Sequence, residues 1–100
     1  MVTLADLPVH HYFGGGVYAK ETLILGGHKL IQHKHKFEHL SILAYGDAIV
    51  NGEKFRGPAV IVMAAEVPHE VISVTDCVWY CIHATEETDP EKIKEEMILP

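Results

Sequence analysis

Apolar and polar residues follow the two-residue period of β-strands along most of the chain. Residues 28–35 and 69–74 alternate, whereas 39–46 and 58–63 are apolar runs typical of buried strands. Glycine pairs, Asn51-Gly52 and a Thr-Asp turn separate these segments. Short strands with turns at regular spacing predict an all-β sandwich or barrel. The expected strands span residues 17–25, 28–35, 39–46, 48–50, 53–55, 58–63, 69–74 and 77–84.

The end of the chain changes to a helical pattern. Asp89 suits the N-cap position, and Pro90 suits the first helical position. Ile93 and Met97 lie four residues apart and therefore share one helix face. We expect a short C-terminal helix over about 89–99, packed on the barrel or on a partner.

Composition narrows the class of protein. One hundred residues fit a single domain, 1–100. The formal net charge of −6 disfavours nucleic acid as a partner, because phosphate binding needs a basic face. No apolar run approaches the roughly 20 residues of a membrane span, and the N-terminus lacks a signal-peptide pattern. We therefore expect a cytoplasmic protein that contacts no membrane, in which Cys77 and Cys81 are free thiols.

Histidine is the unusual feature of the composition, with eight in the chain. His33, His35 and His39 fall within seven residues, and His69 begins a later strand. Neutral imidazole is the commonest protein ligand for transition metals. Taken alone, residues 33–35 fit an exposed basic strand as well as a ligand pair. The remaining histidines with no local partner, His10, His11 and His28, are interpreted as solvent-facing or core residues.

The spacing around these histidines resembles the first motif of the cupin family. That motif runs glycine, five residues, His-x-His, three or four residues, a glutamate, six residues and glycine. Here Gly27 precedes His33-Lys34-His35, and His39 and Gly46 follow at the matching distances. The second motif is degenerate, because Met63-Ala64-Ala65 stands where cupins have Pro-x-Gly, but His69 follows in place. The resemblance covers about residues 17–84.

The resemblance implies a cupin-type double-stranded β-helix, or jelly-roll barrel, with one metal centre. His33, His35, His39 and His69 would bind one divalent transition metal, with Mn, Fe, Cu, Ni and Zn indistinguishable. His39 stands where most cupins carry a glutamate ligand; a slipped turn that brings in Glu38 is the alternative. Four neutral imidazoles would leave the ion with its full +2 charge, which favours anionic ligands.

Two further residues are candidates for a catalytic role. Alternation from His39 sends Tyr45 toward the same side as the ligands. Alternation cannot decide which face of 77–84 points inward: Cys77, Trp79, Cys81 and His83 share one face, and Val78, Tyr80 and Ile82 the other. Resemblance to small cupins favours Cys81 inward, beside the metal; a core cysteine is the alternative.

The expected function is that of a metal-binding cupin that acts as a dioxygenase-like oxidoreductase on a small organic molecule. A non-enzymatic metal- or ligand-binding cupin and a sugar or keto-acid isomerase are the alternatives. The absence of an obviously inward Asp or Glu weakens the isomerase hypothesis, which needs a proton shuttle. We also expect a homodimer, formed through residues 17–25 as an exposed edge strand and through Ile93 and Met97 of the tail helix.

Overall fold

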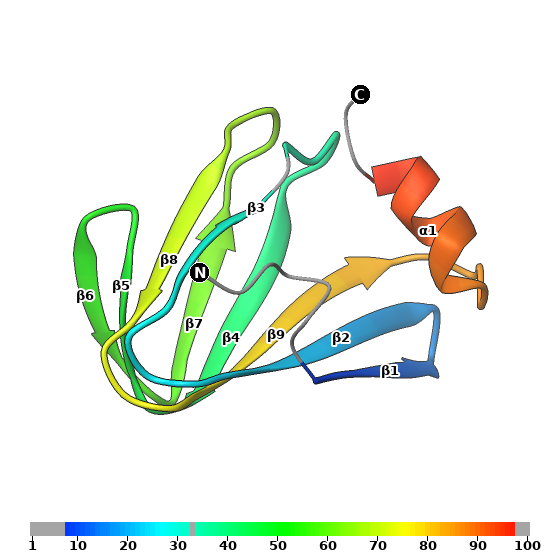
Figure 1. The fold of residues 1–100 in the computed structure, drawn as a ribbon. Helices are drawn as coiled ribbons and strands as arrows, with labels where there is room; N and C mark the ends of the chain where they lie inside the picture. The colour runs from blue at the N-terminus through cyan, green and yellow to red at the C-terminus, as the bar shows by residue number, and fades with distance from the viewer. Residues whose placement is uncertain (1–7, 33, 98–100) are drawn as a thin grey trace.

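The computed structural model describes residues 8–32 and 34–97 and shows the predicted β-sandwich with a C-terminal helix (Figure 1). One sheet has the order β1-β2-β9-β4-β7, and the other has the order β3-β8-β5-β6. All pairings between the described strands are antiparallel. The elements are β1 (Val9–Gly14), β2 (Val17–Ile24), β3 (Lys29–Gln32), β4 (His39–Tyr45), β5 (Asp47–Val50), β6 (Glu53–Arg56), β7 (Ala59–Met63), β8 (His69–Ser73), β9 (Cys77–Ala84) and α1 (Pro90–Met97).

Burial alternates along the strands and shows which side chains lie between the two sheets. In β8 every second residue is buried, as the sequence pattern predicts, and in β4 the alternate residues His39, Ser41 and Leu43 are buried. The core between the sheets centres on Trp79 and Leu43, which are almost fully buried and lie opposite each other on β9 and β4. Asn51 and Gly52 both have positive φ, so the predicted β5–β6 hairpin has a type I′ turn.

The N-terminal half differs from the sequence-based expectation in three ways. The pattern did not predict β1, whose residues are almost all exposed and so show no alternation of burial. β1 pairs along β2, which therefore lies inside its sheet between β1 and β9 and is not an exposed edge. The strand expected over 28–35 is shorter, because β3 ends at Gln32.

The helix lies against its own chain. Asp89 caps α1 by accepting a hydrogen bond from the Glu91 amide, at 3.0 Å. Ile93 is buried and packs with Tyr18 of β2. Ile93 therefore does not supply a free apolar surface for a partner. Among the described residues no helix is long and apolar enough to cross a membrane.

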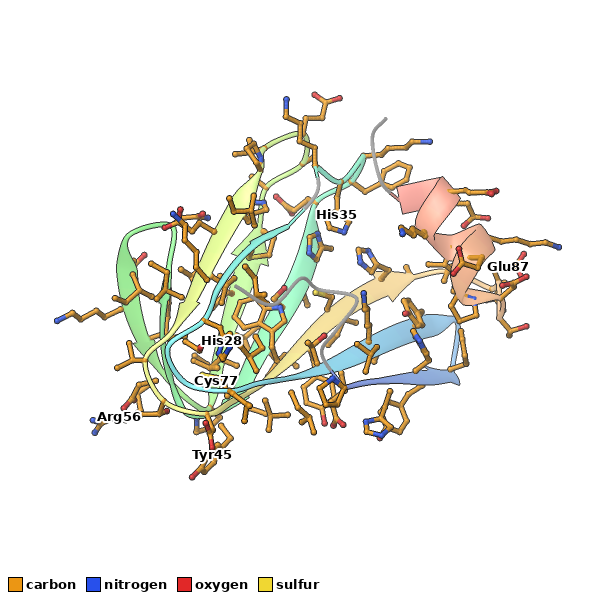
Figure 2. The ribbon with its side chains drawn as sticks, viewed as in Figure 1. His28, His35, Tyr45, Arg56, Cys77 and Glu87 are labelled. Carbon is orange, nitrogen blue, oxygen red and sulfur yellow. The ribbon has the colours of Figure 1, made fainter. Side chains whose placement is uncertain are left out.

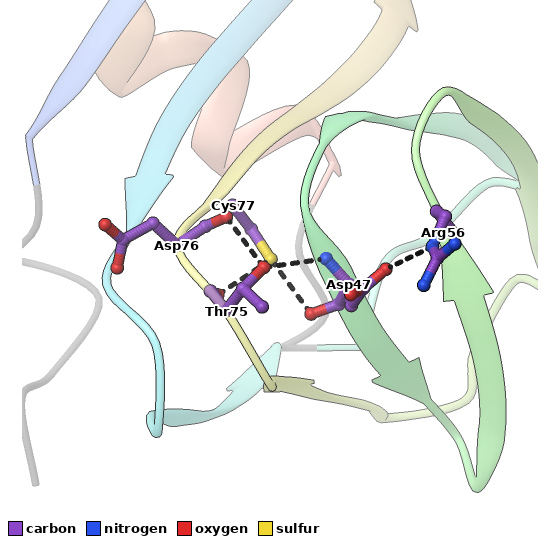
Figure 3. A network of polar contacts seen from close by, with 5 residues as sticks. All are labelled: Asp47, Arg56, Thr75, Asp76 and Cys77. Atoms are coloured by element: carbon purple, nitrogen blue, oxygen red, sulfur yellow. Dashed lines mark hydrogen bonds and ion pairs between the residues drawn. The ribbon is translucent and has the colours of Figure 1, made fainter.

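Hydrogen bonds join the turns at one end of the sandwich (Figure 3). Arg56 Nε donates to Asp47 Oδ1 at 3.0 Å, and the Asp47 amide donates to Thr75 Oγ1 at 2.9 Å. The Cys77 thiol donates to the carbonyl oxygens of Asp47 and Thr75, at 3.3 Å and 3.2 Å. Gly46 has φ of +97°, and a Cβ there would overlap the Asp76 carbonyl oxygen, so glycine is required. This network closes the end of the sandwich at which these turns meet. We refer to it as the closed end.

Candidate metal centre

Three imidazoles meet away from that closed end. His35 follows β3, His39 begins β4, and His83 lies near the end of β9. Their ligand atoms all lie within 4.8 Å of one another. Ring centroids are 4.4 Å apart for His35 and His39, 4.6 Å for His39 and His83, and 5.2 Å for His35 and His83. Figure 2 places His35 at the opposite end of the sandwich from Tyr45 and Cys77.

Strand register accounts for two members of this trio. The β4–β9 pairing sets Leu40 opposite Ile82 and Ser41 opposite Cys81. His39 and His83 are the next pair in the same register, and their side chains point to the buried face. His35 is held by its backbone, because its carbonyl oxygen accepts a hydrogen bond from the Glu66 amide at 2.8 Å. The chain then bends through Lys36 and Phe37 to reach His39.

The arrangement fits a transition metal. His39 and His83 are 5% and 7% exposed. Neither ring nitrogen of His39 makes a hydrogen bond of normal geometry within residues 8–32 and 34–97. A buried polar atom left in this state costs about 1–3 kcal/mol, and a metal ion would remove that cost. Ligands on one tetrahedral ion lie about 3.4 Å apart for metal–nitrogen bonds of about 2.1 Å, so small side-chain rotations would close the trio around it.

Two members of the trio, His39 and His83, are held in the uncharged form that ligates metals. Burial first, and then the neighbouring His39 and His35, lower the pKa of His83 to about 3. Burial also lowers the pKa of His39, against an opposite effect of the Phe37 carbonyl. At neutral pH both rings therefore carry a lone pair for a metal ion.

The four ligands that the sequence predicted are placed differently. His33 lies outside the described residues. His35 and His39 are in the trio, whereas His69 is not. His69 is buried, and its ring nitrogens hydrogen-bond to Asn51 Nδ2 at 2.9 Å and to the Ala64 carbonyl oxygen at 3.0 Å. The alternative residue Glu38 is exposed. Ligation by His33 and His69 therefore stays a prediction.

His83 is the member of the trio that sequence reasoning did not propose. It shares a strand face with Trp79, the largest apolar side chain in the chain. Trp79 is 1% exposed, and its burial turns the whole face inward. The size of Trp79 was the available signal, because such a residue rarely stands on an exposed face.

The structure places the two candidate catalytic residues, Cys81 and Tyr45, in different environments. Cys81 lies on the inward face of β9, partly buried, and its thiol is 3.9 Å from the hydroxyl of Ser41. Tyr45 is 65% exposed, so the expected inward direction is wrong. A β-bulge between Leu43 and Tyr45 shifts the register and reverses the alternation. Tyr45 therefore lies on the surface, away from the trio.

The three histidines expected to have no role in the site all bond elsewhere. His10 Nδ1 contacts Glu21 Oε1 at 3.1 Å, and His28 Nδ1 donates to the Leu25 carbonyl oxygen at 2.8 Å. His11 Nδ1 lies 2.6 Å from the Tyr18 hydroxyl. None of them belongs to the trio.

Comparison with known proteins identifies the fold. No protein-family model and no curated protein sequence matches the chain. Among solved structures, a cupin superfamily protein from Desulfitobacterium hafniense aligns with a TM-score of 0.66 and 10% identity, over 86% of this chain and 84% of that one. An RmlC-like cupin with a double-stranded β-helix fold from Methanocaldococcus jannaschii aligns with a TM-score of 0.64 and 11% identity, over 89% and 86%. The predicted fold is therefore confirmed: the chain is a small cupin-type jelly roll.

Other solved structures with this fold belong to regulatory proteins. A chain in the crystal structure of Rhodobacter sphaeroides SigE in complex with the anti-sigma ChrR aligns with a TM-score of 0.66 and 19% identity. The alignment covers 76% of this chain but 43% of that chain. The cupin domain of an XRE family transcriptional regulator from Enterobacter cloacae aligns with a TM-score of 0.63 and 12% identity, over 76% and 93%. At these identities the likeness concerns the fold alone.

Replacing one histidine of the trio by alanine should release the metal. We expect His39→Ala and His83→Ala each to lower metal affinity at least about tenfold, because each removes one of the three clustered imidazoles. His10→Ala is the control, since it removes an exposed histidine outside the trio. Metal content per chain, measured after dialysis at matched free metal, checks this. His69→Ala should lose less, because its ring nitrogens already bond to protein; full occupancy in His83→Ala would contradict the trio.

Acid should destabilise the metal-free protein through His83. Its pKa is about 6.5 in the unfolded chain and about 3 when folded, so below pH 6.5 the unfolded state binds the extra proton. The stabilising effect is present above pH 6.5 and is lost as pH falls toward 3. With solvent screening, we expect a loss of about 2 kcal/mol between pH 7 and pH 4. Urea unfolding with a chelator present measures this loss of stability. The His83→Asn variant should show a weaker dependence of stability on pH. An equally steep dependence in that variant would contradict the assignment of the effect to His83.

Proposed function

We propose that the chain binds one divalent transition metal ion through His35, His39 and His83, and uses it in oxidative chemistry on a small organic molecule. The observation that carries the proposal is the convergence of three imidazoles from separate segments within 4.8 Å. Three imidazoles leave open positions on an ion of any usual coordination number, and catalysis needs such positions.

The residues around the trio suit a reaction that is shielded from water. Met63 is fully buried opposite His39, and Leu43 and Trp79 close the sandwich below. A redox-active ion bound to the trio would supply the electron-transfer chemistry of the reaction. The neutral imidazoles add no negative charge, so the site would keep a positive potential that attracts anionic molecules.

A second candidate function is non-enzymatic ligand or metal sensing. It is favoured by the regulatory proteins among the solved structures, which include a transcriptional regulator's cupin domain and a SigE–ChrR complex. The isomerase alternative has less support, because no Asp or Glu side chain is buried among the described residues.

Oxygen consumption should separate catalysis from sensing. We expect protein loaded with Fe(II) to consume oxygen when mixed with an electron-rich substrate such as a thiol, an enol or a catechol. Loading with Zn(II), which has no redox chemistry, should abolish the uptake, and His83→Ala should reduce it at least about tenfold. An oxygen electrode measures the rate against a matched concentration of free Fe(II). Uptake no faster than that of free Fe(II) with all three substrate classes would favour the sensing function.

We also propose a homodimer, formed through the outer face of the β1-β2-β9-β4-β7 sheet. Leu40, Val60 and Val62 are 43%, 65% and 60% exposed, and they are neighbours on β4 and β7. Ile42 and Ile82 extend this apolar surface. A contiguous apolar face of this kind marks an interaction site, and a second copy could cover it symmetrically.

Charge placed on this face should dissociate the dimer. Replacing both Val60 and Val62 by lysine sets like charges against each other across a symmetric interface. We expect the unaltered chain to have the mass of a dimer and this variant the mass of a monomer, by light scattering at micromolar concentration. Ile31→Lys, which alters an equally exposed residue on the other sheet, should remain dimeric. A monomeric unaltered chain would contradict the proposal.

A further inference from the structure

Lys20 lies on the inward face of β2, among residues that are otherwise apolar, aromatic or neutral. It is directly opposite Cys81 in the β2–β9 pairing. The pairs on either side in the same face are Tyr18 with His83 and Thr22 with Trp79, and all four of those residues are buried. Because alternate residues share a face, the Lys20 side chain starts from the same face as the metal-binding trio.

The row that contains Lys20 adjoins the row that contains His83. It runs across the sheet from His11 on β1 through Lys20 and Cys81 to Ser41 on β4. The electrostatic effects agree with this position. Burial is the largest cause of the lowered pKa of His11, and Lys20 is the second. Lys20 also lowers the pKa of His83, with a smaller effect than burial and the other two histidines of the trio. The ammonium therefore acts on both rings.

No acidic side chain neutralises Lys20 from the sheet itself. The inward-facing residues of β1, β2, β9, β4 and β7 include no Asp or Glu. The neighbouring Glu21 faces the opposite way, where it contacts His10 and accepts a hydrogen bond from the Tyr80 hydroxyl. Among the described residues, the ion pairs do not include Lys20. Charges on inward faces are usually paired, so an anion that enters the site would find an uncompensated cation there.

We infer that Lys20 binds the carboxylate of the substrate, and that the substrate class is a small molecule with a carboxylate at one end and a metal-binding donor atom at the other. This inference rests on the proposed function, since the donor atom would bind the ion held by the trio. The ion alone attracts anions without orienting them. Lys20 adds a second positive charge to one side of the ion, which selects the orientation of a ligand with two ends.

A structural role for Lys20 makes a different prediction. A lysine can cover apolar surface with its methylene groups and extend its ammonium into water. In that case the ammonium would contact water and not the ligand, and removing its charge would leave ligand affinity unchanged. The two roles can therefore be separated by two ligands that share the metal-binding donor atom and of which only one carries a carboxylate.

Mercaptoacetate and 2-mercaptoethanol form such a pair, because both carry a thiol donor and only the first carries a carboxylate. The full chain is loaded with Co(II), and each thiol is titrated while the sulfur-to-cobalt absorption is recorded. We expect mercaptoacetate to bind at least about tenfold more tightly. Lys20→Met should reduce this preference at least about fivefold by weakening mercaptoacetate alone, and Lys20→Arg should keep most of it. Lys54→Met, which removes an exposed lysine on β6, should behave like the unaltered chain.

The outcomes distinguish this inference from the function on which it rests. A chain that retains no Co(II) overturns the proposed metal site, and the inference fails with it. A chain that retains Co(II) but shows the same preference in Lys20→Met, or no preference when unaltered, overturns the inference alone. Lys20→Gln is a second variant in case Lys20→Met does not fold, and unchanged Co(II) content in the variant assigns the loss to the carboxylate.

Discussion

The antiparallel pairing of β4 with β9 is the constraint on which the rest of the structure depends. It stacks three pairs along the interior: Leu43 with Trp79, then Ser41 with Cys81, then the two histidines of the trio that face each other. Apolar packing of the first pair therefore fixes the position of the polar pairs above it. A slip of one residue would turn every one of these side chains to the outer face.

The candidate metal centre lowers the stability of the fold, while its buried histidines are in the neutral form that binds metals. Burial keeps His39 and His83 neutral, and the ring nitrogens of His39 make no hydrogen bond of normal geometry among the described residues. A chain selected for stability alone would gain by replacing such a residue with an apolar one. Polar groups that are buried but not satisfied are typical of sites prepared for a ligand, where local stability is given up for binding.

The two ends of the sandwich use their polar groups differently. At the closed end, Cys77 is 3% exposed and donates to two carbonyl oxygens, and burial raises the pKa of its thiol. Cys81 starts from the same strand face but lies between the core and the trio, where it is only partly buried. Two cysteines on one strand thus have separate environments, one held by the fold and the other beside the candidate site.

By itself the sequence determined the strand segments from residue 17 onward, the Asn51-Gly52 turn and, through the resemblance of its histidine spacing to the cupin motif, the fold and two of the three clustered histidines, His35 and His39. These features depend on local period and short spacing, which a linear chain displays directly. The tertiary structure decided what depends on pairing between distant segments. Both faces of 77–84 contain large apolar residues, so alternation left the inward face open, and the pairing of β9 with β2 and β4 placed His83 on it. A bulge absent from any periodic pattern turned Tyr45 outward, and β1 was found only through its pairing with β2. Register and bulges are set by the packing of whole sheets, because each backbone hydrogen bond between strands is satisfied only when its partner strand is in place.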